Sequence, residues 1–245
     1  MSAIGDRPRL GLIVPSTNLT IERLLHRSGF TEVFGVDVVV TRLPVTTIAA
    51  TPGSDRQFQP RRLLAATRLL ADARPDVIAW TGTSSFWLGL DEEVAWMRSV
   101  GAEFGVPLTS ATEAVVEALQ ALGRPKVSLF TPYEEPIHRA VATTLGEAGF
   151  RVRHQTNLGI TDNASFAALD PAVIEEAVRG FPGDDPVVVV CTNVTACILD
   201  AEVVDSLVAV LWHAMALAAE QKGWSGGSAS YRGFHDALAA RSAVV

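Results

Sequence analysis

The hydrophobic positions of this chain fall into short continuous runs that alternate with segments of helical spacing. The clearest run is the four valines at 187–190, which follow Pro186 and end in Cys191. A continuous β-branched run predicts a strand that is buried on both faces, as in parallel sheets. Ligands of open α/β sheets bind beyond the carboxyl ends of such strands, so Cys191 is expected at the mouth of a crevice. A buried, unreactive cysteine is the alternative interpretation.

The first half of the chain repeats this alternation. Strands are expected over residues 10–14, 36–40 and 76–80, and helices over 19–27, 61–73 and from 86 onward. Residues 45–59 are polar and contain Pro52 and Gly53, which predicts a loop long enough to cover a site.

The second half follows the same plan. Strands are expected over residues 126–130, 150–156 and 187–190, and helices over 136–148, 171–179 and 203–219. The stretch Trp-Thr-Gly-Thr-Ser at 80–84 aligns with Val-Val-Cys-Thr-Asn at 189–193, which places Gly82 opposite Cys191. Alternating strands and helices predict parallel, doubly wound sheets with right-handed crossovers.

The sequence therefore predicts an α/β fold of two pseudo-symmetric, doubly wound lobes with parallel sheets. The N-terminal lobe is expected over residues 1–108, with a contribution from the helix at 203–219, and the C-terminal lobe over 109–202. Residues 221–245 contain Gly223, Gly226 and Gly227 and are expected to form a loosely ordered tail.

Composition narrows the class of protein. The 245 residues are 48% hydrophobic and 19% charged, with a formal net charge of −7, which is typical of a soluble globular protein. The sequence has no basic block and no apolar run of membrane-spanning length, so we expect neither nucleic acid nor membrane as a partner. The N-terminus does not resemble a signal peptide, and a cytoplasmic location is predicted.

The cysteines and histidines do not form a metal motif. Cys191 and Cys197 are six residues apart, about 240° on a helix, which points them to different faces. The five histidines have no ligand spacing. We therefore expect no disulfide and no metal.

Five short motifs carry a resemblance to a known family. They are residues 11–18 (Gly-Leu-Ile-Val-Pro-Ser-Thr-Asn), 82–84 (Gly-Thr-Ser), 131–133 (Thr-Pro-Tyr), 159–163 (Gly-Ile-Thr-Asp-Asn) and 191–193 (Cys-Thr-Asn). From about Leu10 to Ala219 the chain resembles the aspartate/glutamate racemase superfamily, and more closely its branch of maleate cis-trans isomerases and arylmalonate decarboxylases. The resemblance implies an enzyme without metal or organic cofactor, whose site lies between two lobes.

The resemblance also implies roles for individual residues. Cys191 matches the catalytic cysteine, and Thr83, Ser84 and Tyr133 match the donors that bind the oxyanion in the decarboxylases. The residues expected to bind substrate are Ser16, Asn18, Gly82, Asn163, Thr192 and Asn193. In maleate isomerases, the positions of Asn18, Asn163 and Tyr133 bind the substrate carboxylates. From the residues alone, the two asparagines would also suit turns or helix caps.

Gly82 separates the activities of the family. Racemases and maleate isomerases carry a first-lobe cysteine there, whereas arylmalonate decarboxylases carry glycine. Loss of CO2 from a malonate-like acid leaves an enediolate, which needs fixed donors and then a proton from one face. The sequence therefore predicts decarboxylation of a substituted malonate, with Cys191 as the proton donor.

Three points stay open at this stage. One alternative activity is that of a maleate cis-trans isomerase, or of a relative acting on another dicarboxylate or an amino-acid derivative. Another alternative is a binding protein that kept the cleft and lost turnover. The expected partner is a small carboxylate or dicarboxylate substrate, and formation of a homo-oligomer is undecided.

Overall fold

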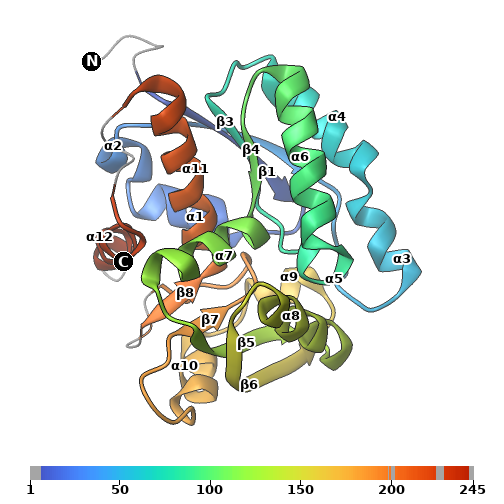
Figure 1. Cartoon of the computed structure of the whole chain (residues 1–245), viewed down its shortest axis with the longest axis vertical. Coiled ribbons are helices and arrows are strands. Elements are labelled where there is room, and N and C mark those ends of the chain that lie inside the picture. Colours follow the sequence, from blue (N-terminus) through green and yellow to red (C-terminus); the bar gives the residue numbers. More distant parts are fainter. Residues whose placement is uncertain (1–6, 198, 200–201, 225–228, 243–245) are drawn as a thin grey trace.

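The computed structural model describes residues 7–197, 199, 202–224 and 229–242. They form two four-stranded sheets, one in the upper and one in the lower part of Figure 1. The strand orders are β2-β1-β3-β4 and β6-β5-β7-β8, and every pairing within them is parallel. Because the second order repeats the first, the predicted fold of two related, parallel-sheet lobes is confirmed.

The first sheet and its helices take up the chain as far as residue 122. Its strands are β1 (Arg9–Pro15), β2 (Asp37–Leu43), β3 (Val77–Trp80) and β4 (Leu108–Ser110). The helices are α1 (Thr20–Arg27), α2 (Phe30–Phe34), α3 (Pro52–Asp55), the 3₁₀ turn η1 (Arg56–Phe58), α4 (Pro60–Ala71), α5 (Ser85–Leu88), α6 (Leu90–Phe104) and α7 (Ala111–Leu122). The predicted lobe boundary at residue 108 thus falls inside β4.

The second sheet is built in the same way. Its strands are β5 (Lys126–Tyr133), β6 (Arg151–Ile160), β7 (Val187–Val189) and β8 (Val203–Asp205). The helices are α8 (Glu135–Glu147), α9 (Asn163–Phe166), α10 (Pro171–Arg179), α11 (Ser206–Lys222) and α12 (Tyr231–Ser242). Helix α11 returns to the first lobe, where it packs against α7, β1, β3 and β4.

The helix predicted over 203–219 begins later than expected. Val203 and Val204 pair with Val187 and Val188 as part of β8, because β-branched residues suit a buried strand. The Asp205 carboxylate then accepts a hydrogen bond from the Leu207 N–H at 2.8 Å. This N-cap starts α11 at Ser206.

The prediction of a loosely ordered tail is wrong for residues 231–242, which form α12. Tyr231, Phe234 and Leu238 of this helix are buried, and the Phe234 ring lies 4.8 Å from the Phe34 ring of α2. Gly223 adopts a left-handed conformation that ends α11, while Gly226 and Gly227 lie outside the described residues. In the sequence, these glycines lie between two packed helices, α11 and α12.

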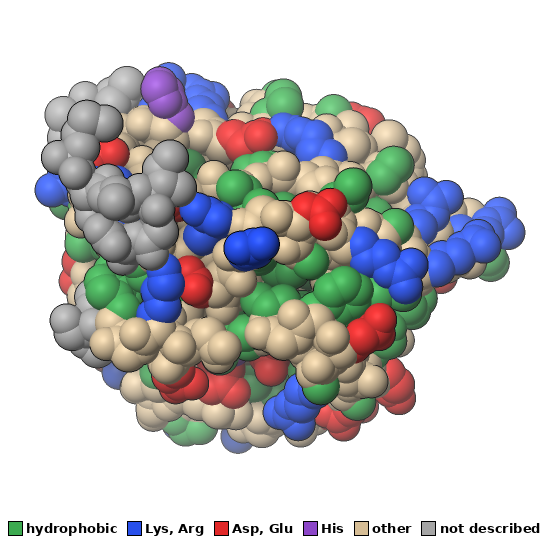
Figure 2. Space-filling model, turned by 90° about the horizontal axis from the view of Figure 1, so that it is seen from above, with side chains coloured by type: hydrophobic (Ala, Val, Ile, Leu, Met, Phe, Trp, Pro, Cys, Tyr) green, Lys and Arg blue, Asp and Glu red, His purple; other side chains and the backbone are tan. Residues whose placement is uncertain are grey.

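Among the residues that the structure describes, no helix is both long enough and apolar enough to cross a lipid bilayer. Figure 2 shows acidic and basic side chains interspersed on one face, with basic side chains gathered at its right-hand edge.

We predict that Phe234→Ala lowers the free energy of unfolding by about 3–5 kcal/mol, the usual cost of removing a buried ring. As a control, Leu69→Ala removes a side chain that is 66% exposed and should change stability by less than about 0.5 kcal/mol. Urea denaturation of both variants measures the difference. Equal effects would show that α12 does not pack on the body of the protein.

Candidate active site

A small pocket lies where the loops after β1, β3 and β7 meet the end of β5. Its lining residues are Pro15, Asn18, Val45, Ile48, Phe58, Gly82, Thr83, Ser84, Trp87, Tyr133, Asn163, Cys191, Thr192 and Asn193. The cavity volume is about 20 Å³, which leaves room for about one water molecule. The structure therefore shows this site in a closed form.

Cys191 lies directly beyond β7 and is 2% exposed. Its backbone N–H donates to the Ser206 hydroxyl oxygen at 3.1 Å. Burial raises the pKa of the Cys191 thiol to about 12, although hydrogen bonds from the Asn193 N–H and the Tyr133 hydroxyl act in the opposite direction. At neutral pH the thiol is therefore protonated.

Two of the predicted oxyanion donors form a pair across the lobes. The Thr83 hydroxyl is 2.9 Å from the Tyr133 hydroxyl, and burial raises the pKa of Tyr133 well above its usual value. The Tyr133 ring is held edge-on between Trp87 and Phe166, with ring centroids 5.8 and 5.5 Å away. Tyr133 thus presents a fixed, neutral hydroxyl group beside the Cys191 thiol.

Asn18 uses both ends of its side chain to join the lobes. Its amide group donates to the carbonyl and hydroxyl oxygens of Thr192, both at 3.1 Å. Its oxygen accepts from the N–H groups of Thr20 and Ile21 at 3.0 and 3.1 Å, and so caps α1. Direct carboxylate binding by Asn18 stays a prediction, because in the closed form these bonds would first have to break.

The other predicted polar residues are also hydrogen-bonded, either within the second lobe or across to the first. The Asn193 amide group donates to the Asn163 carbonyl at 2.6 Å, and the Thr192 hydroxyl donates to the Thr81 carbonyl at 2.6 Å. Ser16 does not line the pocket; its hydroxyl oxygen instead accepts from the Val45 N–H at 3.1 Å. The structure thus gathers all the predicted site residues except Ser16.

Residues 45–59, predicted to be a covering loop, reach from the first lobe to the second. Thr47 bridges to Asp162, and the Ile48 N–H donates to the Thr161 carbonyl at 2.8 Å. Val45, Ile48 and Phe58 line the pocket, roles that the sequence analysis missed. The sequence signal that could have identified a pocket residue here was Phe58, an isolated aromatic residue in a polar loop.

Trp80 fills the space beside Gly82. A Cβ atom added at Gly82 would lie 2.1 Å from Cζ2 and 2.2 Å from Cε2 of the Trp80 indole. Trp80 is 1% exposed, and its N–H donates to the Ser84 hydroxyl oxygen at 3.4 Å. Trp80 is therefore a core residue, and a side chain at position 82 would require its indole to shift.

The pocket offers neutral donors. Among its described lining residues there is no lysine or arginine, so a bound carboxylate would be held by hydroxyl, amide and backbone N–H groups. Within the described ranges, no cluster of three or more His, Cys, Asp or Glu side chains could hold a metal ion.

The two-lobed α/β fold brings a buried cysteine against neutral donors in the cleft, and the comparisons with known proteins identify this arrangement as that of an enzyme family. A family model for arylmalonate decarboxylase matches residues 59–229, and the chain therefore belongs to this family, to which maleate isomerases are related.

Individual relatives include both activities. The maleate isomerase of Nocardia farcinica (strain IFM 10152) is 28% identical over 182 residues, or 70% of each chain. The arylmalonate decarboxylase of Bordetella bronchiseptica is 31% identical over 157 residues, which cover 58% of this chain and 65% of the relative. A crystal structure of a maleate isomerase variant from Pseudomonas putida S16 with maleate shares the fold, with a TM-score of 0.77 and 20% identity over 93% of this chain and 98% of that one.

We predict that Gly82→Ala destabilises the protein by about 1–3 kcal/mol, because its Cβ would collide with the Trp80 indole. The cost should be smaller in a Trp80→Leu background, and a double-mutant cycle by chemical denaturation measures the coupling. Gly146→Ala is the matched control, since a Cβ at Gly146 meets nothing within 4 Å. Equal costs of Gly82→Ala in both backgrounds would contradict the proposed contact.

Proposed function

We propose that this enzyme decarboxylates a substituted malonate and that Cys191 is its proton donor. The family establishes an enzyme of the maleate isomerase and arylmalonate decarboxylase group. One observation favours decarboxylation within that group: the pocket has a single, buried, protonated thiol, and a second thiol at position 82 would collide with the Trp80 indole.

In this reaction the C–C bond to one carboxylate breaks and CO2 leaves. The electron pair stays on the substrate, where it spreads onto the remaining carboxylate as an enediolate. In this proposal the hydroxyl groups of Thr83, Ser84 and Tyr133 donate to the enediolate oxygens, and a donor of this kind typically lowers the barrier by about 3–4 kcal/mol. The Cys191 thiol then gives its proton to the α-carbon, and the thiolate is reprotonated by water.

The geometry favours a one-faced protonation. Cys191 approaches from the second lobe, while the corresponding position of the first lobe has only Gly82 and the buried Trp80 behind it. A prochiral malonate is therefore expected to give one enantiomer.

Maleate isomerisation is the second candidate, and the relatives favour it. More of the named relatives are maleate isomerases than decarboxylases. In that reaction a cysteine thiolate would add to one carbon of the double bond, the new single bond would rotate, and the thiolate would leave to give fumarate. Cys191 would need to lose its proton first, which burial disfavours.

The deciding experiment incubates the protein with phenylmalonate and, separately, with maleate in deuterated water. We expect CO2 release with deuterium at the α-carbon, loss of turnover in Cys191→Ala, and turnover retained in Cys197→Ala. Fumarate formation without CO2 release would establish the isomerase instead. Equal loss in the two cysteine variants would point to a packing requirement that they share.

The pH dependence separates the two roles of Cys191. A proton donor with a pKa of about 12 is fully protonated at lower pH, so log kcat/KM should stay flat between about pH 7 and pH 9. A thiolate nucleophile with the same pKa would become about tenfold more abundant per pH unit over this range. Initial rates at constant ionic strength measure the slope, and a slope near one would refute the donor role.

A further inference from the structure

The turn that carries Cys191 is fixed by two adjacent residues at the start of α11. The Ser206 hydroxyl oxygen accepts from the Cys191 N–H at 3.1 Å, and the second Asp205 oxygen, Oδ2, accepts from the Ala196 N–H at 3.0 Å. The first oxygen, Oδ1, accepts from the Leu207 N–H at 2.8 Å. The turn from Cys191 to Ala196 is thus hydrogen-bonded at both ends to the start of α11.

We propose that Asp205 is a positioning residue for Cys191, and that the C-terminal helix α12 holds Asp205 in place through Tyr231. Asp205 is fully buried and does not line the pocket, so it acts through the turn and does not touch the substrate. The proposal rests on the proposed catalytic role of Cys191.

If Asp205 only capped helix α11, it would need just one of its two carboxylate oxygens. An N-cap needs one acceptor oxygen, and asparagine serves as well as aspartate there. Here the second oxygen bonds to Ala196, in the turn that begins with Cys191. The carboxylate therefore joins the start of α11 to the catalytic turn, a task that an amide cannot complete because its nitrogen cannot accept an N–H.

Tyr231 provides the link to α12. Its hydroxyl oxygen accepts from the Asp205 N–H at 3.1 Å and donates to the Val203 carbonyl at 3.4 Å. The ring is 2% exposed and packs edge-on against Trp212, with centroids 5.6 Å apart. On the same helix Phe234 packs against Phe34 of the first lobe, so α12 contacts both lobes.

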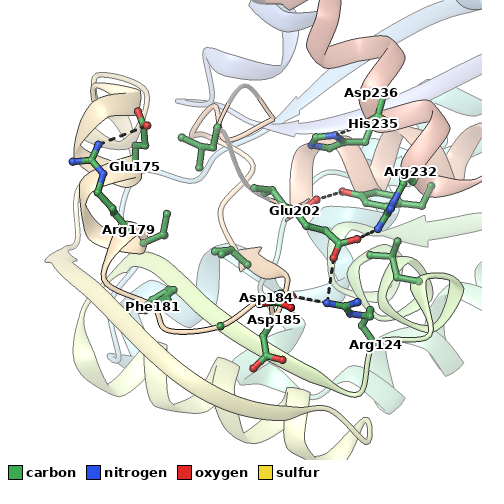
Figure 3. A pocket seen from close by; sticks show the side chains of 17 residues that line it. Arg124, Glu175, Arg179, Phe181, Asp184, Asp185, Glu202, Arg232, His235 and Asp236 are labelled. Carbon is green, nitrogen blue, oxygen red and sulfur yellow. Dashed lines mark hydrogen bonds and ion pairs between the residues drawn. The ribbon is translucent and has the colours of Figure 1, made fainter.

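Figure 3 shows a second attachment of α12, at the wall of a separate pocket. Arg232 reaches from α12 to the Glu202 carboxylate, which also pairs with Arg124 at 3.6 Å. These side chains are partly exposed to solvent, and the contact does not involve Asp205. Arg232 therefore offers a control on the same helix.

The ionisable groups that face Asp205 are Cys191, Cys197, Tyr231 and His235. Burial raises the pKa of Asp205, and backbone hydrogen bonds and His235 oppose this shift. Burial is the main cause of the raised pKa of Cys191, and a negative charge on Asp205 raises that pKa further. The same residue that fixes the turn thus also favours the protonated thiol.

The test measures Cys191 directly, by its alkylation rate with iodoacetamide at several pH values. Tandem mass spectrometry distinguishes Cys191 from Cys197. In Asp205→Asn we expect alkylation of Cys191 to be about tenfold faster or more, with the pH midpoint shifted lower, since a lost buried hydrogen bond is worth about this much. Tyr231→Phe should act in the same direction, and Arg232→Gln should leave the rate unchanged.

Turnover provides the second readout. With substrate, Asp205→Asn should lower kcat about tenfold or more and leave KM within about twofold, at a temperature where circular dichroism shows the variant folded. Unchanged Cys191 alkylation in Asp205→Asn and Tyr231→Phe, or an equal change in Arg232→Gln, would overturn the inference. Turnover that persists in Cys191→Ala would refute the proposed function, while the alkylation result would still decide the role of Asp205.

Discussion

The hydrogen bonds that join the loop after β1 to the loop after β7 hold the rest of the site together. The Asn18 amide donates to Thr192, and the Asn193 amide donates to the Thr17 carbonyl. These bonds bring the carboxyl ends of two separate parallel sheets against each other. Buried amides and hydroxyls are costly unless they are paired, so closure of the cleft and pairing of these groups occur together.

Closure determines the chemistry available to Cys191. In the closed cleft water is nearly excluded, and burial keeps the thiol and the Tyr133 hydroxyl protonated. Neutral donors suit a reaction that develops negative charge on the substrate, because the charge appears only as the reaction proceeds. The indole of Trp80 occupies the space beside Gly82, on the opposite side of the proposed site from Cys191.

Cys191 could be predicted as a site residue because it follows a buried strand, whereas the roles of Thr83, Ser84 and Tyr133 were implied by the family resemblance. Thr83, Ser84, Tyr133 and Cys191 lie at the ends of β3, β5 and β7, where parallel sheets present their ligand-binding residues. Covering residues such as Phe58 were missed because a loop's path depends on the partner it meets. Asp205 was not among the predicted site residues, because its bond to Ala196 depends on how the turn after Cys191 folds back.

The sequence by itself determined the alternation of strands and helices, the two-lobed repeat and the position of Cys191, because these depend on local hydrophobic pattern and on residue order. Tertiary structure decided what the pattern does not contain. Val203 and Val204 became a strand because β7 was available to pair with, and residues 231–242 became a packed helix because Phe30 and Phe34 offered an apolar surface. The Trp80 indole occupies the space beside Gly82 only because of how the end of β3 folds. The local sequence around a residue does not indicate which distant segment it will pack against. Such contacts are therefore known only from burial and pairing in the folded chain.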